Sequence, residues 1–123
     1  MKNQKYLQIN GHNNKNFELI VFGSIVQDLL EGKGRRSQAV MASKLGTRTA
    51  MIGCVGDDIF AETNISSISQ NGVDTSMIEK LKESNTGVAC ITVTSDGENS
   101  IIVNLGANKC LGAKNARNYR SVI

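Results

Sequence analysis

The sequence contains no proline and no tryptophan, and it has few other aromatic residues: three Phe and two Tyr among 123 residues. Average usage would give a chain of this length about six prolines, so its turns must be made chiefly by its 12 glycines. With so few aromatic rings, the core has to be built from aliphatic side chains. The length suits one domain with one core.

Long apolar runs and clustered metal ligands are also absent from the sequence. No stretch approaches the roughly 18 apolar residues of a membrane helix. Residues 1–16 are polar, which predicts a disordered tail rather than a secretory signal. The only histidine, His12, has no Cys, Asp or Glu at ligand spacing, so we expect no metal site there. These absences predict a cytoplasmic, or else nuclear, protein with no membrane partner.

Charge and cysteine usage argue against two further classes of protein. The net charge is only +3, and the basic residues are scattered, with few aromatic residues among them. That pattern argues against nucleic-acid binding. The cysteines, Cys54, Cys90 and Cys110, are odd in number and have no CxxC spacing. We expect them to be reduced, buried thiols of a cytosolic protein.

Hydrophobic patterning predicts an alternation of strands and helices in the first part of the chain. The expected elements are a buried strand at 17–23, a helix at 37–45, a strand at 49–55 and a helix at about 59–70. Strands separated by helices pair in parallel through right-handed crossovers. The expected fold class is therefore α/β.

The second part of the chain has a different character. Residues 87–94 and 100–105 are partly alternating and β-branched, and they flank a turn sequence at 95–99. This pattern predicts a β-hairpin. Residues 110–123 are basic and weakly patterned, so we expect them to be either poorly ordered or a short helix.

An acidic residue and a glycine-rich turn lie close together after the first expected strand. Asp28 follows the 17–23 run, and Gly32-Lys33-Gly34 begins four residues later, ahead of the expected helix. A carboxylate at the carboxyl edge of a parallel sheet can accept hydrogen bonds from two vicinal sugar hydroxyls. Glycine N–H groups and a lysine at a helix N-terminus suit a polar or anionic ligand. Two plainer interpretations stay open: Asp28 caps the following turn, or the glycines form an ordinary loop.

Two other acidic motifs have simple structural interpretations. Gly56-Asp57-Asp58 could bind a metal, but adjacent acids point in different directions, and one of them suits the N-cap of the next helix. Asp96-Gly97-Glu98-Asn99 fits a hairpin turn better than a site. We therefore expect structural roles for both motifs.

Taken in order, these motifs resemble the ribokinase family, the PfkB-type carbohydrate kinases. The resemblance covers about residues 17–109. It rests on Gly23-Ser24-Ile25 with Asp28, Gly32-Lys33-Gly34, Gln38-Ala39-Val40, Leu45-Gly46, Val55-Gly56-Asp57-Asp58-Ile59-Phe60, Thr86-Gly87-Val88-Ala89, Asp96-Gly97-Glu98-Asn99, Ile101-Ile102-Val103 and Gly106-Ala107-Asn108. It implies a doubly wound α/β fold with a small β-sheet lid over a sugar.

The resemblance also implies an activity, which is the ATP-dependent phosphorylation of D-ribose at its 5-hydroxyl to ribose 5-phosphate. Mg²⁺ and a monovalent cation such as K⁺ would assist. Asp28 matches the family's aspartate that holds sugar hydroxyls, and Gly32, Lys33 and Gly34 match its sugar-binding turn. D-ribose or a similar sugar is the implied small-molecule partner.

The sequence departs from the family pattern in several places. Val26 stands where the family has Asn, and Glu31 replaces the first glycine of the sugar-binding turn. Asp28 and Gly32 are nearly adjacent, where the family carries a long lid segment. The family's catalytic base, anion hole and ATP site have no counterpart in these residues. A lid deletion and a missing C-terminal catalytic half are therefore expected.

These departures predict a partial kinase fold that is inactive alone. We expect a disordered tail at 1–16, a partial ribokinase-like domain at 17–109 and a divergent C-terminal tail at 110–123. The hairpin at 87–105 is expected to lack partner strands. An alternative function is non-catalytic, with the exposed hairpin edge pairing with a second copy or with a full-length kinase.

Overall fold

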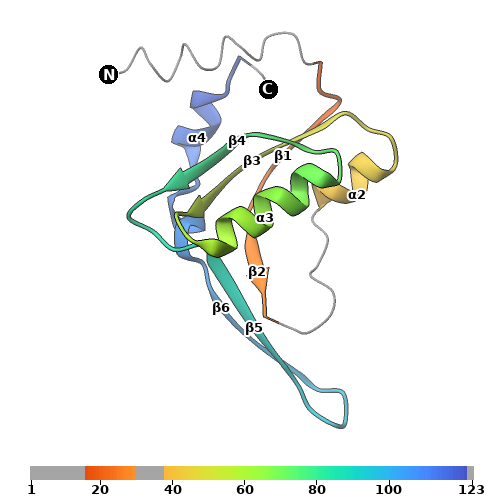
Figure 1. The fold of residues 1–123 in the computed structure, drawn as a ribbon, viewed down its shortest axis with the longest axis vertical. Helices are drawn as coiled ribbons and strands as arrows, with labels where there is room; N and C mark the ends of the chain where they lie inside the picture. Colours follow the sequence, from red (N-terminus) through yellow and green to blue (C-terminus); the bar gives the residue numbers. More distant parts are fainter. Residues whose placement is uncertain (1–15, 30–37, 122–123) are drawn as a thin grey trace.

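A computed structural model of the chain describes residues 16–29 and 38–121 (Figure 1). The strands form two three-stranded sheets, with the orders β1-β3-β4 and β2-β5-β6. The first sheet consists of β1 (Leu19–Phe22), β3 (Thr49–Gly56) and β4 (Asp74–Leu81), all parallel. The helices α2 (Gln38–Lys44) and α3 (Ile59–Gln70) connect these strands in the sequence. The expected α/β class is therefore confirmed.

Strand β3 is the centre of the first sheet, and all eight of its residues are buried. Because side chains alternate along a strand, Met51 and Val55 pack with α2 and α3, whereas Ala50 and Ile52 face the other side. Leu111 and Tyr119 from the C-terminal segment cover that second side. Layers on both faces explain why β3 is apolar throughout rather than alternating.

The second sheet extends away from the first and is drawn at the bottom of Figure 1. It consists of β2 (Val26–Asp28), β5 (Gly87–Val93) and β6 (Asn99–Asn104). The hairpin of β5 and β6 is confirmed, and Gly97, with φ of +89°, makes its turn. Strand β2 pairs with β5 in parallel. The expectation that the hairpin lacks partner strands was wrong, because three residues near Asp28 form a strand too short for hydrophobic patterning to detect.

The segment after β6 turns back onto the first sheet. It forms a 3₁₀ helix, η1 (Gly106–Cys110), and the short helix α4 (Ala113–Asn118). Of the two alternatives for residues 110–123, the short helix is the one observed. No helix among the described residues has the length and apolar character needed to cross a membrane.

The cysteines are free, but they differ in exposure. Cys54 is buried in β3, as expected, whereas Cys90 and Cys110 are exposed. The expectation of three buried thiols was therefore wrong for two of them. Cys90 lies in β5, on the exposed side of the hairpin. Apolar residues beside it in the sequence therefore do not bury its thiol.

Candidate functional site

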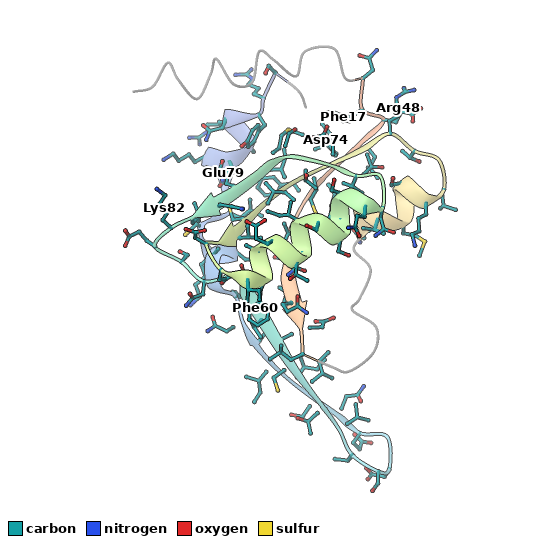
Figure 2. The ribbon with its side chains drawn as sticks, viewed as in Figure 1. Phe17, Arg48, Phe60, Asp74, Glu79 and Lys82 are labelled. Carbon is teal, nitrogen blue, oxygen red and sulfur yellow. The ribbon has the colours of Figure 1, made fainter. Side chains whose placement is uncertain are left out.

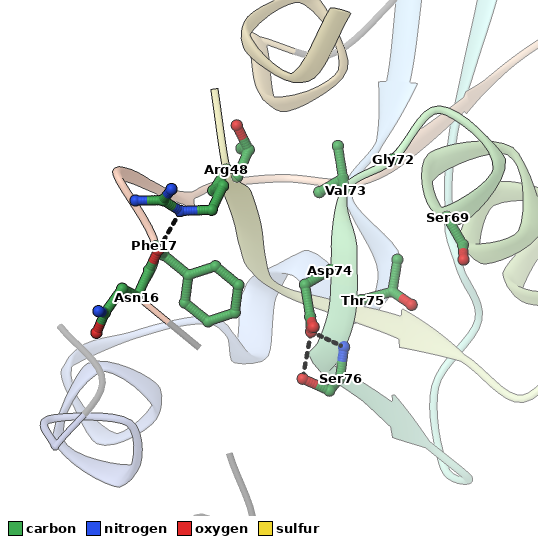
Figure 3. Close-up of a pocket in the computed structure, with 10 residues that line it drawn as sticks. Asn16, Phe17, Arg48, Ser69, Gly72, Val73, Asp74, Thr75 and Ser76 are labelled. Atoms are coloured by element: carbon green, nitrogen blue, oxygen red, sulfur yellow. Dashed lines mark hydrogen bonds between the residues drawn. The ribbon is translucent and has the colours of Figure 1, made fainter. Parts of the chain in front are cut away.

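A first hollow on the surface of the described residues offers little free chemistry. It has a volume of about 890 Å³ and lies where β3 and β4 begin (Figure 3). Arg48 Nε donates to the Asn16 carbonyl at 2.7 Å, and Asp74 accepts from the Ser76 N–H at 3.0 Å. Its two charged side chains, those of Arg48 and Asp74, thus already have hydrogen-bond partners. It also lies at the amino ends of these strands, whereas ligands of open α/β sheets bind at the carboxyl ends.

The second hollow, of about 800 Å³, lies between the helices and the second sheet. Asp28 lines it from the end of β2, and Asn64 and Ser67 line it from α3. The hairpin contributes four apolar side chains: Ala89, Ile91, Ile101 and Val103. This hollow is the candidate site because it combines a carboxylate with a concave apolar wall.

Strand register explains why the carboxylate and the apolar wall meet. Asp28 pairs with Ala89, and Ala89 in turn pairs with Val103, so the three residues form one row across the second sheet. Ile91 and Ile101 pair two residues further along. Register partners and residues two apart share a face of the sheet. The carboxylate therefore lies on the face that carries the apolar wall.

This arrangement suits a small polyol. Each carboxylate oxygen can accept hydrogen bonds from hydroxyl groups, and the aliphatic wall can cover the C–H groups of a sugar ring. The prediction that Asp28 directly follows the 17–23 strand needs correction, because Asp28 ends the separate strand β2. Gly32, Lys33 and Gly34 lie outside the described residues, as do Leu30 and Glu31, two of the three residues between Asp28 and Gly32 where a lid deletion was expected.

One buried side chain fixes the start of β2. Asn108 is 8% exposed, and its side-chain amide accepts one hydrogen bond from the backbone of Ile25 and donates another to it. The Ile25 N–H donates to Asn108 Oδ1 and Asn108 Nδ2 donates to the Ile25 carbonyl, each at 2.8 Å. Asn108 Nδ2 also donates to the Leu105 carbonyl at 2.9 Å. These side-chain bonds therefore extend, on the N-terminal side, the short ladder that β2 makes with β5.

Gly87 makes room for this amide. A Cβ at Gly87 would lie 2.5 Å from Asn108 Nδ2 and 2.8 Å from the Leu105 oxygen. Any larger residue would displace the amide from the Ile25 backbone. The Thr86-Gly87 and Gly106-Ala107-Asn108 motifs thus meet in space, although the sequence separates them by about twenty residues.

A second junction joins the hairpin to the first sheet. Asp58 is the N-cap of α3, and its Oδ1 accepts from the Ala61 N–H at 2.9 Å. The same carboxylate accepts from the Thr86 N–H and from Thr86 Oγ1, each at 2.7 Å. Thr86 Oγ1 in turn accepts from the Gly56 N–H at 3.0 Å. The predicted N-cap is therefore confirmed for Asp58.

The pKa of Asp58 reflects these contacts. Desolvation raises the pKa of its carboxyl, but the hydrogen bonds from Thr86 and from the backbone of Ala61 and Phe60 outweigh it. The net result is a pKa below the ordinary value. The charged form of Asp58 thus contributes to holding the hairpin on the sheet.

One cofactor implied by the family, Mg²⁺, finds no cluster of acidic, histidine or cysteine side chains among the described residues. Within 16–29 and 38–121 no three or more His, Cys, Asp or Glu side chains gather in a group that could hold a metal ion.

Comparisons with known proteins agree with this architecture. The family model "pfkB family carbohydrate kinase" matches residues 32–121, a range that includes α4. A deoxyribokinase from Salmonella typhi is 44% identical over 80 residues, which are 65% of this chain and 26% of that protein. The chain thus spans about a quarter of the length of this curated relative.

Solved structures give the same fold. A ribokinase from Giardia lamblia superposes with a TM-score of 0.72 at 23% identity, over 87% of this chain and 39% of that one. Arabidopsis thaliana ribokinase, solved with ribose and ATP, gives 0.65 at 23% identity, over 87% and 43%. At such identities the likeness concerns the fold.

Sequence reasoning missed the residues that hold the site together. Asn108 and Thr86 were noticed only as parts of motifs, and nothing in one sequence says that an Asn will bond a backbone 83 residues away. The apolar wall did have a signal. Ala89 and Ile91, and likewise Ile101 and Val103, alternate along two strands of one hairpin, which places them on one face.

Proposed function

Because the chain belongs to the pfkB family of carbohydrate kinases, we propose that it forms the sugar-binding part of a ribokinase-type site. Its ligand is D-ribose or a similar pentose, held by the Asp28 carboxylate. The observation that carries the proposal is the row from Asp28 through Ala89 to Val103, where a carboxylate adjoins the apolar wall. Gly32, Lys33 and Gly34 are proposed to complete the site with backbone N–H groups and a cation.

The reaction in which this site takes part would be the phosphorylation of the sugar's 5-hydroxyl by ATP, assisted by Mg²⁺ and K⁺. The described residues position the sugar in that reaction. Asp28 would accept hydrogen bonds from two hydroxyls, and the wall would exclude water from the ring. Phosphoryl transfer depends on positioning and on electrostatic stabilisation of the phosphoryl group. In this proposal the described residues contribute the positioning of the sugar.

We expect Asp28→Asn to weaken D-ribose binding by roughly 10- to 100-fold, because hydrogen bonds to an ionised carboxylate are worth about 1.5–3 kcal/mol. Isothermal titration calorimetry of the 123-residue chain measures this effect. Glu83→Gln is the matched control, since Glu83 is an exposed carboxylate in the β4–β5 turn. Equal affinities for wild type and Asp28→Asn would exclude a role for Asp28 in binding the sugar.

Residues 1–123 are proposed to bind the sugar without phosphorylating it. The supporting facts are the quarter of the relative's length that the chain spans and the lack of a metal cluster among the described residues. A coupled assay for ADP release measures this directly. Ribose-dependent turnover by the purified chain would contradict the proposal.

A second candidate function is pairing through the free edge of the hairpin. Strand β6 is an edge strand, all six of its residues are exposed, and Ile102 is 73% exposed. Exposed apolar edges favour strand addition by another chain. We propose a second copy of this chain as the partner, with antiparallel pairing of the two β6 strands, and a full-length kinase as the alternative partner.

We expect Ile102→Lys to convert such a dimer into a monomer, because the introduced charges would meet across the paired edges. Sedimentation velocity with wild type and variant gives the mass. Asn99→Lys, at the tip of the same strand, serves as the control. A monomeric wild type that also fails to bind a full-length family kinase would exclude this second function.

A further inference from the structure

The peptide group that follows Asp28 is held from both of its sides. Its N–H, on Leu29, donates to the Ala89 carbonyl at 2.9 Å. Its carbonyl oxygen, on Asp28, accepts from the side chain of Gln27 at 3.0 Å. The bond from Leu29 to Ala89 is part of the sheet formed by β2, β5 and β6. The bond to the Asp28 carbonyl comes from the Gln27 side chain, which also contacts helix α3.

The Gln27 side chain leads to helix α3. Its Oε1 accepts from Asn64 Nδ2 at 3.1 Å, and the same Nδ2 donates to the Phe60 carbonyl at 2.7 Å. Asn64 is therefore anchored to its own helix, one turn after the cap made by Asp58. Phe60 is labelled in Figure 2 in the first turn of α3, beside the root of the second sheet. The chain of bonds runs from the α3 backbone to the Asp28 backbone across one wall of the candidate site.

We propose that Gln27 and Asn64 form a latch that positions the Asp28 carboxylate, making both of them positioning residues for the sugar. Strand β2 is only three residues long, and Asn108 fixes its start but not its end. Together with the bond from the Leu29 N–H to the Ala89 carbonyl, the latch fixes the end that carries Asp28 and links that end to α3. The proposal rests on the sugar-binding role proposed for Asp28.

The proposed latch predicts an effect that can be measured in the protein without bound sugar. If Asn64 is truncated, Gln27 loses its anchor, and the bond from Gln27 to the Asp28 carbonyl weakens although Asn64 itself does not touch Asp28. The Leu29 amide should then open more often. A role for Asn64 in helix stability alone would leave the peptide group after Asp28 unchanged.

The experiment compares Gln27→Ala, Asn64→Ala and their double variant, with Ser66→Ala as a control, since Ser66 is an exposed residue of α3 that does not line the hollow. We measure amide exchange of Leu29, the carbonyl ¹³C shift of Asp28 and the affinity for D-ribose. Each single variant is expected to raise Leu29 exchange and lower ribose affinity about fivefold, the equivalent of one neutral hydrogen bond. The double variant is expected to be no worse than either single one, because both remove the same interaction.

The outcomes separate the latch from the proposed function. If wild type and Asp28→Asn bind ribose equally, the sugar role fails, while Leu29 exchange and the Asp28 carbonyl shift still report on the latch. If ribose binding depends on Asp28 but neither single variant changes Leu29 exchange or affinity, the latch is overturned. Additive losses in the double variant would overturn it as well.

Discussion

Replacing Asn108 by Ala is expected to lower the free energy of unfolding by about 3 kcal/mol and to detach β2 from the hairpin. The substitution leaves the buried N–H and carbonyl of Ile25 without the partners they have at 2.8 Å. A buried polar group that loses its partner costs roughly 1–3 kcal/mol. Urea unfolding followed by circular dichroism gives the free energy, and amide exchange of Ile25 gives the local effect.

Two further variants test the Asn108 interpretation. Asn108→Asp keeps the acceptor for the Ile25 N–H but removes the donor to the Ile25 carbonyl, so we expect it to be destabilising too. Asn104→Ala is the matched control, because Asn104 is exposed and accepts a single bond from the nearby Gly106 N–H at 3.1 Å. An Asn108→Ala protein as stable as the Asn104→Ala protein would contradict the account of how β2 is held.

Replacing Asp58 by Ala is expected to cost about 2–3 kcal/mol of stability. The loss combines a helix N-cap, worth about 1 kcal/mol, with two hydrogen bonds from Thr86 to a charged acceptor. The hairpin should also become more mobile, since Thr86 directly precedes β5. Thermal unfolding with hydrogen exchange across residues 86–93 measures both effects. Asp57→Ala, which removes an exposed acid next to the cap, should stay within about 0.5 kcal/mol of wild type.

The same carboxylate predicts how stability depends on pH. The folded pKa of Asp58 is lower than its ordinary value of about 3.9. Its contribution is therefore fully present above about pH 4 and is lost as the pH falls through the folded value. We expect the unfolding free energy of wild type to fall more steeply below pH 4 than that of Asp58→Asn. Parallel slopes for the two proteins would show that the Thr86 bonds do not depend on the charge of Asp58.

The elements with strong periodicity could be predicted from the sequence. The helix expected at about 59–70 is α3 (Ile59–Gln70), and the hairpin turn falls at Gly97. Strand β4 was missed because it is polar along most of its length and buries only Met77. An edge strand needs few apolar residues, and single-sequence patterning cannot then distinguish it from a loop.

Part of the candidate site was also predictable, but only as isolated residues. The residue type and position of Asp28 predict a sugar ligand, and the sequence predicts that one of Asp57 and Asp58 caps the next helix, which the structure shows to be Asp58. The hydrogen bonds between Asp58 and Thr86 join segments that are distant in the sequence, and so do those between Asn108 and Ile25. Such contacts leave no local pattern, because an Asn or Thr in a loop satisfies the same local preferences whether or not it is buried.

The central claim is that a sugar binds on the row formed by Asp28, Ala89 and Val103. Titrating D-ribose into the ¹⁵N-labelled 123-residue chain tests it directly, with backbone amide shifts as the readout. The largest shifts are expected on this row and on its neighbours in the apolar wall, and Asp28→Asn should need roughly 10- to 100-fold more ribose to reach them. Shifts that centre instead on Arg48 and Asp74 in the other hollow, or that saturate at the same ribose concentration in Asp28→Asn, would contradict sugar binding at Asp28.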